Sequence, residues 1–596
     1  MLDLSQLPHH DGSPLYLSRV SAGIQIRLSA PPGAYLRVSL RWSASGEVHA
    51  DECVRVADPL AEFEWWSAVV PDDRGSLHYR FLLVSLDQHL FHYNPLGVSE
   101  VEPLDDTDFR YVVHDAHNDV PSKAVAYFIL LDRFARSSTS SNRNASNWSA
   151  DPRRLASPMR FYGGDLAGVS NHLNELQELG VDVLVISPFF PAPEFHRYCA
   201  ESFDEVDEEL GGEAALVGLV GECHERGMLC LGDLTLNHCG STHPWFARAI
   251  SDPTSLERIM FSFHTDGTYH CYYGVETLPS LNYSAQLTID RMISSENAPL
   301  KKWVRAPFLL DGWRFDAAPL VGRCGEVDLN RVIATVAIDE LTRAHANALH
   351  FAEILHDPAN DLRDGRWAGT TRDAGFASPV RDFVENDHFG GEQLWRKLSL
   401  FAEVLDWATL TRSLNFVGSH DIPRIASIAG SPGRSLMAHF LLLTMPGTPM
   451  LYAGDEYYLL GATTEEARQP IHWTSLSSQA RWFFDQLRQT IFIRRENPAL
   501  QRGSLRWLAA GQNAVAYERR DLNQRLVCVA GRRRDTLAFQ VPSSYRAPMC
   551  LYAHDAQWIQ DGSQARIALG EGGGFGVWRL DHDGPHSAER ADASLS

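Results

Sequence analysis

The sequence predicts an α/β protein: a (β/α)₈ TIM barrel with an insertion after its third strand, flanked by N-terminal and C-terminal β-sandwich domains. Its 596 residues exceed one ordinary domain and suffice for a barrel, which needs about 250 residues. From about residue 125, apolar segments alternate with amphipathic helical stretches, which is typical of βαβ units. Both ends of the chain carry short alternating segments separated by turn residues. The 44% share of apolar residues suits packed cores rather than disorder.

Residues 1–120 are predicted to form the N-terminal β-sandwich. The segments Gly23–Leu28, Tyr35–Leu40 and His78–Val84 alternate apolar and polar side chains, and Pro, Gly and Asp separate them. This alternation is the period of a strand with one buried face. Several such strands in succession favour two packed sheets.

Residues 121–502 are predicted to form the barrel. Seven segments have the apolar run of a buried parallel strand: Ala124–Leu131, Val181–Ser187, Met228–Leu236, Gly312–Phe315, Leu349–Ala352, Leu414–Val417 and Pro449–Tyr452. An eighth strand, poorly marked, is expected near residues 373–378. Between the first two strands, Asn171–Gly180 predicts a helix that stops at its glycine.

The insertion is placed at residues 239–290. This stretch follows the third strand without a helical pattern and is rich in Tyr, His, Pro and Gly. A long excursion from a βα loop usually shapes one wall of an active site. Residues 503–580 are predicted to form the C-terminal β-sandwich, and the polar residues 581–596 a disordered tail.

Composition excludes several classes of function. The formal net charge of −22 argues against nucleic-acid binding, which needs clustered Lys and Arg. No basic segment followed by an apolar one opens the chain, and no apolar run approaches the roughly 18 residues of a membrane span. We therefore expect no nucleic-acid and no membrane partner, and a cytoplasmic location. The nine cysteines are scattered without a C-x-x-C pair, so neither a zinc ribbon nor a disulfide framework is indicated.

Four polar clusters lie where predicted strands end: Asp233–His238, Gly312–Asp316, Phe351–Glu353 and Phe416–Asp421. A carboxylate that ends an apolar strand costs free energy to desolvate unless it is paired or used. In a barrel these strand ends meet on one face, where active sites lie. The intervals between the clusters correspond to whole βα units, apart from the one that contains the insertion. The clusters are therefore expected to converge.

The converging carboxylates predict a retaining glycosidase, which needs a carboxylate nucleophile close to a carboxylic acid. We assign Asp316 as the nucleophile and Glu353 as the general acid and then base. Asp421 is expected to bind sugar hydroxyls and to stabilise the transition state. Arg314 lies two residues before Asp316 on one strand, so both side chains share a face and the guanidinium is expected to lower the pKa of Asp316.

Two histidines, His238 and His420, are expected to donate or accept hydrogen bonds at the sugar. A lone histidine at such a position is more often a satisfied structural residue. The four clusters together, in this order and spacing, favour the functional interpretation.

These clusters resemble the four signature regions of the α-amylase family, glycoside hydrolase family 13, including the R-x-D pair of the second region. Further segments are similar to the family's first barrel strand, to the turn before its first helix and to the end of its eighth strand: Leu130–Ala135, Phe161–Gly168 and Tyr452–Glu456. The resemblance covers roughly residues 20–580, and it implies the same barrel and the same chemistry.

Some segments narrow the resemblance to maltodextrin glucosidases, cyclomaltodextrinases and neopullulanases. Leu278–Asn282 is similar to their "MPKLN" or "LPKLD" segment, and Ala467–Trp473 to their "CRRPMIW" segment. Gly375, Phe376 and Pro379 resemble maltodextrin glucosidase most. The resemblance implies α-1,4-linked maltodextrins as the substrate, with cyclodextrins and pullulan as further candidates.

The same resemblance implies that Tyr198 stacks on the sugar at the cleavage site. The family has an aspartate where this chain has Cys199, and Ala317–Pro319 is apolar where the family often carries a polar residue at the acceptor site. These departures keep an α-glucan transglycosidase open as an alternative to a hydrolase. A non-catalytic carbohydrate-binding protein is a third alternative, against which the intact catalytic residues argue.

No cofactor is required by the proposed chemistry. Some relatives bind calcium near the first barrel loop, where Asn142, Asn144, Asn147 and Asp165 offer hard oxygen ligands, although such a loop is more often simply solvated. In the insertion, Tyr272 is a candidate for stacking on glucose, with core packing as an equal alternative. The resemblance allows a monomer or a homodimer.

Overall fold

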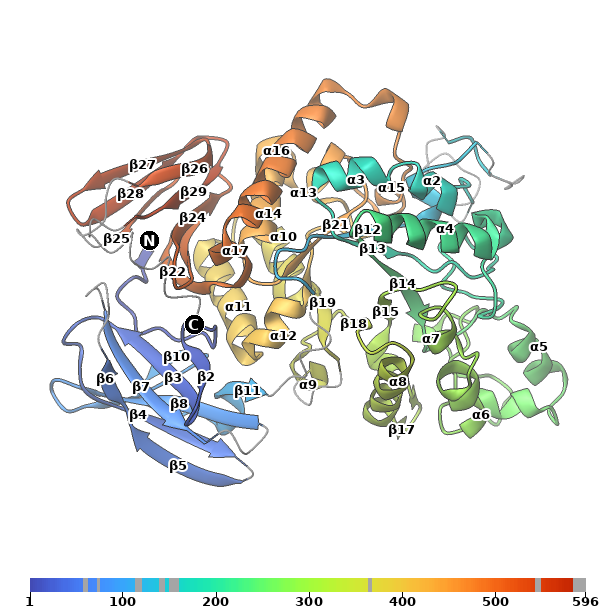
Figure 1. Cartoon of the computed structure of the whole chain (residues 1–596), viewed down its shortest axis with the longest axis horizontal. Helices are drawn as coiled ribbons and strands as arrows, with labels where there is room; N and C mark the ends of the chain where they lie inside the picture. Colours follow the sequence, from blue (N-terminus) through green and yellow to red (C-terminus); the bar gives the residue numbers. More distant parts are fainter. Residues whose placement is uncertain are drawn as a thin grey trace.

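The computed structural model describes nine segments of the chain: residues 1–44, 46–56, 63–71, 76–112, 120–138, 145–148, 160–362, 367–541 and 548–581. Two regions of antiparallel sheet lie beside each other at one end of the molecule, and the barrel with its insertion extends from them (Figure 1). Of the predicted tail, residues 581–596, all but residue 581 lie outside the described residues. Within the described ranges, no helix is both long enough and apolar enough to cross a membrane.

Eight parallel strands close into the predicted barrel, in which β12 pairs with both β13 and β21. The strands are β12 (Ala126–Ile129), β13 (Val183–Ile186), β14 (Leu229–Thr235), β15 (Gly312–Asp316), β18 (Leu349–Ile354), β19 (Gly369–Arg372), β20 (Leu414–Asn415) and β21 (Thr448–Tyr452). Most of their side chains are buried, because parallel strands are covered on both faces.

The sixth strand does not lie where the sequence predicted it. It spans Gly369–Arg372, and the predicted segment 373–378 instead begins a helical turn that leads into α10 (Ser378–Glu385). This strand can bury polar residues in place of an apolar run because their side chains form hydrogen bonds to residues of the neighbouring strands. Thr370 Oγ1 donates to the carbonyl of Ala352 at 2.9 Å, and Arg372 donates to Asn415 Oδ1 at 2.8 Å.

Helices surround the barrel and follow its strands in the chain. The longer ones are α3 (Leu173–Leu179), α4 (Gly212–Glu225), α8 (Asn330–Ala344), α11 (Gly391–Val404), α14 (Pro432–Thr444) and α16 (Ser478–Glu496). Shorter helices are α1 (Leu131–Phe134), α2 (Leu166–Ser170), α7 (Pro299–Lys302), α9 (Ala359–Leu362), α12 (Trp407–Arg412), α13 (Ile425–Ala429), α15 (Thr464–Ala467) and α17 (Pro498–Arg502). Helix α3 ends at Gly180, whose φ of 100° is the left-handed conformation expected of a glycine stop.

The insertion between β14 and β15 folds back onto the strand end. It contains α5 (Pro244–Ser251) and α6 (Gln286–Ile289), so the expectation of a stretch without helical pattern is wrong at these positions. Helix α5 is only eight residues long, so it spans little more than two turns. An isolated bridge pairs His238 with Ser280 and ties the insertion to the end of β14.

The N-terminal region consists of two antiparallel sheets that enclose an apolar core. One sheet contains β2 (Leu17–Val20), β3 (Gly23–Ala30), β7 (Glu64–Val70) and β6 (Val54–Val56). The other contains β10 (Gly97–Ser99), β9 (Leu90–Asn94), β8 (Ser76–Ser85), β4 (Tyr35–Ala44), β5 (Glu47–Glu52) and β11 (Phe109–Val112).

The C-terminal region also has two sheets with a core of their own. The larger contains β1 (Leu2–Asp3), β22 (Ser504–Ala510), β23 (Ala514–Arg520), β24 (Arg525–Gly531), β29 (Gly574–Arg579) and β26 (Met549–His554), and the smaller β25 (Thr536–Gln540), β28 (Gln564–Leu569) and β27 (Ala556–Asp561). Strand β1 shows that the first residues of the chain pair with the C-terminal sheet. Arg506 strengthens this link by donating to the carbonyls of Ser5 and Leu7.

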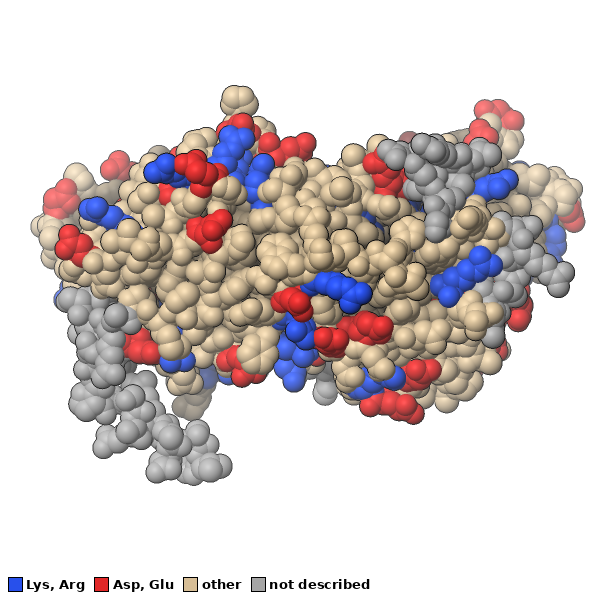
Figure 2. All heavy atoms as spheres, turned by 90° about the horizontal axis from the view of Figure 1, so that it is seen from above, with Lys and Arg blue, Asp and Glu red and all other residues tan. Residues whose placement is uncertain are grey.

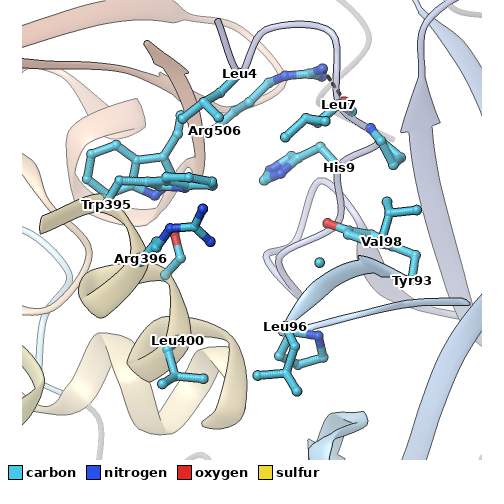
Figure 3. A pocket seen from close by; sticks show the side chains of 15 residues that line it. Leu4, Leu7, His9, Tyr93, Leu96, Val98, Trp395, Arg396, Leu400 and Arg506 are labelled. Atoms are coloured by element: carbon cyan, nitrogen blue, oxygen red, sulfur yellow. Dashed lines mark hydrogen bonds between the residues drawn. The ribbon is translucent and has the colours of Figure 1, made fainter. Parts of the chain in front are cut away.

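A cavity of about 470 Å³ lies where the three regions meet. Trp395 and Leu400 on α11 face Leu96 and Val98 of the N-terminal region across it (Figure 3). On the face of the molecule shown in Figure 2, acidic and basic side chains are interspersed among uncharged areas, so this face carries no continuous basic stripe.

Candidate active site

The predicted site residues meet at the carboxyl ends of the barrel strands. Asp233 lies on β14, Arg314 and Asp316 on β15, and Glu353 on β18. Strands β14, β15 and β18 are neighbours, and Arg314 lies opposite Asp233 in the register. The four side chains therefore come together although the insertion separates the first from the others in the chain.

Arg314 is the buried hub of this group. Its Nη1 donates to Asp233 Oδ2 at 2.6 Å and to Asp316 Oδ1 at 3.2 Å. Its Nη2 forms an ion pair with Glu353 Oε1. The contact between Arg314 and Asp316 is the one that their spacing on a strand predicted. One guanidinium thus holds three carboxyl groups within direct contact of itself.

The pKa values of two of these carboxyl groups lie above their ordinary range. Burial raises the pKa of Asp316 well above its usual value, nearby Glu353 raises it further, and Arg314 opposes both. Burial likewise raises the pKa of Asp233 to about 6 against the opposing charge of Arg314. Arg314 does lower the pKa of Asp316, as expected, but burial and the nearby Glu353 raise it by more, so the net shift is upward.

Glu353 is held at both oxygens. While Arg314 contacts Oε1, the backbone N–H of Ala317 donates to Oε2 at 2.9 Å. Ala317 follows β15 in a left-handed conformation, with a φ of 46°, which is uncommon for a residue other than glycine. The side chain of Glu353 remains 11% exposed, so its carboxyl group is largely shielded from solvent. Nothing in the sequence indicates this contact between the Ala317 backbone and Glu353.

Tyr198, in the segment after β13, lies against the carboxylate group. Its hydroxyl donates to Asp233 Oδ2 at 2.9 Å and lies 3.1 Å from His420 Nε2. The rings of Tyr198 and His420 stack with centroids 5.6 Å apart, and Phe128 stacks on the other side of His420 at 4.9 Å. This packing fixes both polar rings at the mouth of the barrel.

Asp421 is the most open of the three predicted catalytic carboxylates, with its side chain 50% exposed. Arg468 Nη2 donates to Asp421 Oδ1 at 3.0 Å, and His420 Nε2 lies 3.2 Å from Oδ2. Although burial raises the pKa of Asp421, its electrostatic interactions with His420, Arg468 and Arg314 together bring the pKa below its ordinary value. Asp421 therefore stays ionised more readily than Asp316 or Asp233.

Two residues of the site were not assigned a role from the sequence. Arg468 belongs to a segment whose resemblance was noticed, but its partner Asp421 is distant in the chain. Asp233 belongs to a strand-end cluster, and its burial and contacts with Arg314 and Tyr198 emerge only from the fold. Asp233 Oδ1 is buried and has no hydrogen-bond partner among the described residues, so it offers an acceptor.

His238 and Tyr272 form the side of the site that the insertion builds. Their rings lie 5.1 Å apart, and burial lowers the pKa of His238 to about 4. Burial also lowers the pKa of His420 to about 4, so both histidines are neutral near pH 7. The pKa of the Tyr272 hydroxyl is raised by burial first and then by Asp316 and Glu353, which places it near the carboxylates. The adjacent Tyr273 is 78% exposed.

The calcium hypothesis stays a prediction. Asn142 and Asn144 lie outside the described residues. The carboxylate of Asp165 accepts hydrogen bonds from Ser137 Oγ at 2.7 Å and from the backbone N–H of Gly168 at 2.6 Å. These bonds give Asp165 a structural role at the start of α2.

Comparisons with known proteins agree with the barrel fold. The family model described as "Alpha amylase, catalytic domain" matches residues 128–268 and 391–519. The chain is 26% identical to the cyclomaltodextrinase of Geobacillus thermopakistaniensis strain MAS1, over 81% of this chain and 82% of that protein. It is 27% identical to neopullulanase 2 of Thermoactinomyces vulgaris, over 87% and 90%. A solved cyclomaltodextrinase structure superposes with a TM-score of 0.75 at 22% identity, covering 97% of this chain and 100% of the other.

Proposed function

Because the chain belongs to the α-amylase family, glycoside hydrolase family 13, and is a glycoside hydrolase, we propose that it hydrolyses α-1,4-glucosidic bonds of maltodextrins with retention of configuration. The observation that carries this proposal is the contact of Asp316 and Glu353 with one guanidinium, that of Arg314. Two carboxyl groups that share a single cation lie close together, as the short separation in retaining enzymes requires. The names of the relatives support cyclodextrins and pullulan as further substrates.

In the first step, the Asp316 carboxylate attacks the anomeric carbon, and Glu353 transfers its proton to the leaving oxygen. The glucosidic bond breaks, and a glycosyl ester forms on Asp316. In the second step, Glu353 takes a proton from water as the water attacks the ester, which restores both groups. Asp421, ionised and half-exposed, is proposed to bind sugar hydroxyls and to oppose the positive charge that develops on the ring.

Because the pKa of Asp316 is raised, this scheme depends on which carboxyl group of the site carries a proton. Asp233, Asp316 and Glu353 surround one positive charge, so the site favours the binding of a proton. Catalysis needs that proton on Glu353 and needs Asp316 ionised. Asp233 and Asp316 therefore bind protons at higher pH than ordinary carboxyl groups, and the active form is the one in which Asp316 is ionised.

The pH dependence of kcat/KM should reveal these raised pKa values. Activity is expected to fall at a higher pH than the ordinary pKa of an aspartate would give, because the raised pKa of Asp316 lets a proton remove the ionised nucleophile, and Asp233 beside it has a pKa of about 6. The sign follows from the direction of the pKa shifts: a raised pKa means that protonation begins at higher pH. The neutral His238 and His420 do not titrate in this range. Initial rates on maltotriose between pH 4 and 8 locate the pH at which kcat/KM falls on the acid side. A fall only near pH 4, the ordinary range of a carboxyl group, would contradict the raised pKa of Asp316.

A transglycosidase remains the second candidate. The residues after the nucleophile, Ala317 and Ala318, are apolar and buried, so that side of the site offers few polar side chains to order an attacking water. The same glycosyl ester would then pass to a sugar hydroxyl. A non-catalytic sugar-binding protein has less support, because Asp316, Glu353 and Arg314 are in contact as catalysis requires.

One assay separates these candidates. The protein is incubated with maltotriose, β-cyclodextrin or pullulan, and the products are followed by thin-layer chromatography and by the anomeric signals of proton NMR. Smaller sugars released first as the α-anomer support retaining hydrolysis, whereas products longer than the starting sugar support transfer. Glu353→Gln is the control, and loss of the general acid is expected to lower the rate about 10²–10⁴-fold. If wild type and this variant are equally inert on all three sugars, the proposed function is wrong.

A further inference from the structure

Glu194, His196 and Cys199 form a polar cluster directly behind Tyr198. One ligand atom from each of the three lies within 4.8 Å of the other two. Glu194 Oε2 lies 2.7 Å from His196 Nε2, and Cys199 is buried with 2% exposure. None of these residues touches the catalytic carboxylates, and the mechanism described above does not use them.

Hydrogen bonds on both nitrogens determine the state of His196. The backbone N–H of Tyr198 donates to Nδ1 at 3.1 Å, so Nδ1 is an acceptor. A neutral imidazole that accepts at Nδ1 carries its hydrogen on Nε2, and this hydrogen points to Glu194. The donor set of the cluster also suits a transition metal. A metal on Nε2 would have to displace this hydrogen while Nδ1 already accepts, so the geometry favours the hydrogen-bonded chain.

The chain continues from His196 to the catalytic centre. The rings of His196 and Tyr198 lie 5.7 Å apart, and the Tyr198 backbone is held by the His196 ring. At its other end, the Tyr198 hydroxyl donates to Asp233, which is paired with Arg314. A change in the His196 ring therefore alters the pose of the Tyr198 ring, the proposed platform for the sugar.

We propose that Glu194 is a positioning residue that acts through His196: its carboxylate fixes the tautomer and orientation of this ring and so holds Tyr198 in the pose that receives the sugar. This inference rests on the proposed function. It also assigns Glu194 the carboxylate function in this cluster, since Cys199 approaches the same space but brings only a thiol. Glu194 is suited to the task because the hydrogen bond from His196 lowers its pKa and keeps it ionised.

The test moves the carboxylate from one side of the cluster to the other. Glu194→Ala is expected to raise KM for maltotriose and to lower kcat/KM about 10- to 100-fold, as misplacement of a substrate-positioning group does. Glu194→Gln retains an acceptor for Nε2–H and should keep most of the activity. In the double variant Glu194→Ala with Cys199→Asp, a carboxylate from position 199 reaches His196, and most of the lost kcat/KM should return.

The outcomes separate positioning from simple loss of stability. Thermal unfolding of each variant is measured alongside kinetics, and the affinity for maltotriose is measured by calorimetry in the Glu353→Gln background. A loss of affinity in Glu194→Ala at unchanged Tm, recovered in the double variant, supports the inference. Equal kinetics for wild type and Glu194→Ala, or no recovery in the double variant, overturns it.

Two further readouts complete the test. If wild type itself is inert on the sugars, the proposed function is wrong. If wild type is active and Glu194→Ala has the same kinetics, only the positioning role of Glu194 is wrong. Titration of wild type with Zn²⁺ alone tests whether the cluster is a metal site instead. Tight Zn²⁺ binding that Cys199→Ser abolishes would overturn the hydrogen-bonded chain, because the three side chains would then be metal ligands.

Discussion

Asp316→Ala is expected to lower kcat/KM about 10⁴-fold or more, a loss comparable with removal of a nucleophile in other covalent enzymes. The physical reason is that no other carboxylate can reach the anomeric carbon from the position of Asp316. Asp233 is fully buried and paired with Arg314, and Asp421 lies at the open edge of the site. Steady-state rates on maltotriose or a chromogenic maltoside give the value.

A small anion makes this prediction specific to a nucleophile. Azide or formate can enter the space that Asp316→Ala leaves beside Arg314 and attack the same carbon. We expect partial recovery of bond cleavage with azide, and a glycosyl azide of inverted, β configuration identified by NMR. Glu353→Ala serves as the matched control, since azide added there intercepts the ester on Asp316 and yields the α product. A β product from both variants would contradict the assignment of Asp316.

Arg314→Met is expected to destabilise the folded barrel by about 3–5 kcal/mol at pH 7, which is the usual cost of removing one partner from a buried ion pair. The Arg314 side chain is 6% exposed and contacts three carboxyl groups, so its loss leaves several negative charges without a cation in a poorly solvated site. Activity should also be lost, because the nucleophile can no longer ionise. Urea-induced unfolding, followed by tryptophan fluorescence, measures the change in stability.

The pH dependence of this destabilisation provides the check. Burial already raises the pKa of Asp233 to about 6 in the presence of Arg314, and without that cation the folded pKa lies higher still. A carboxyl group whose folded pKa exceeds its unfolded value stabilises the protein at low pH, and this stability is lost as pH rises through the folded pKa. The deficit of Arg314→Met relative to wild type should therefore shrink from pH 7 to pH 5.

Arg468→Met is the matched control for stability. Arg468 pairs with Asp421, whose side chain is half-exposed, so the lost ion pair is expected to cost no more than about 1 kcal/mol. If both variants are destabilised equally, the inference that Arg314 stabilises the fold through its three carboxyl partners is wrong. A deficit in Arg314→Met that stays constant between pH 5 and 7 would also contradict it.

Much of the barrel could be predicted because its signals are local. The strands β12 and β13 are continuous apolar runs, and Gly180 marks the end of a helix with its left-handed conformation. Strand β19 escaped prediction because it buries Thr370 and Arg372, whose side chains form hydrogen bonds to residues of the neighbouring strands β18 and β20. Apolar runs do not identify a strand whose buried polar side chains form hydrogen bonds to neighbouring strands.

The candidate site was predictable for a similar reason. Asp316, Glu353 and Asp421 end predicted strands, and a closed barrel brings all such ends to one face. The same reasoning gave the wrong net direction for the pKa of Asp316, because it considered only the lowering effect of Arg314 and left out burial and the nearby Glu353. The number of carboxyl groups around Arg314 depends on the register of three strands, which the spacing of two residues on one strand does not contain.

By itself, the sequence determined the barrel, its flanking sheets and the three carboxylates at its mouth, because strand periodicity and strand ends are properties of short segments. Only the tertiary structure decided how charges and hydrogen bonds are shared at that mouth. The division of Arg314 among its carboxylates, the pairing of Arg468 with Asp421 and the contact of Glu194 with His196 are set by side-chain distances. Electrostatic interactions depend on those distances and on burial, and both are fixed when the strands and loops pack.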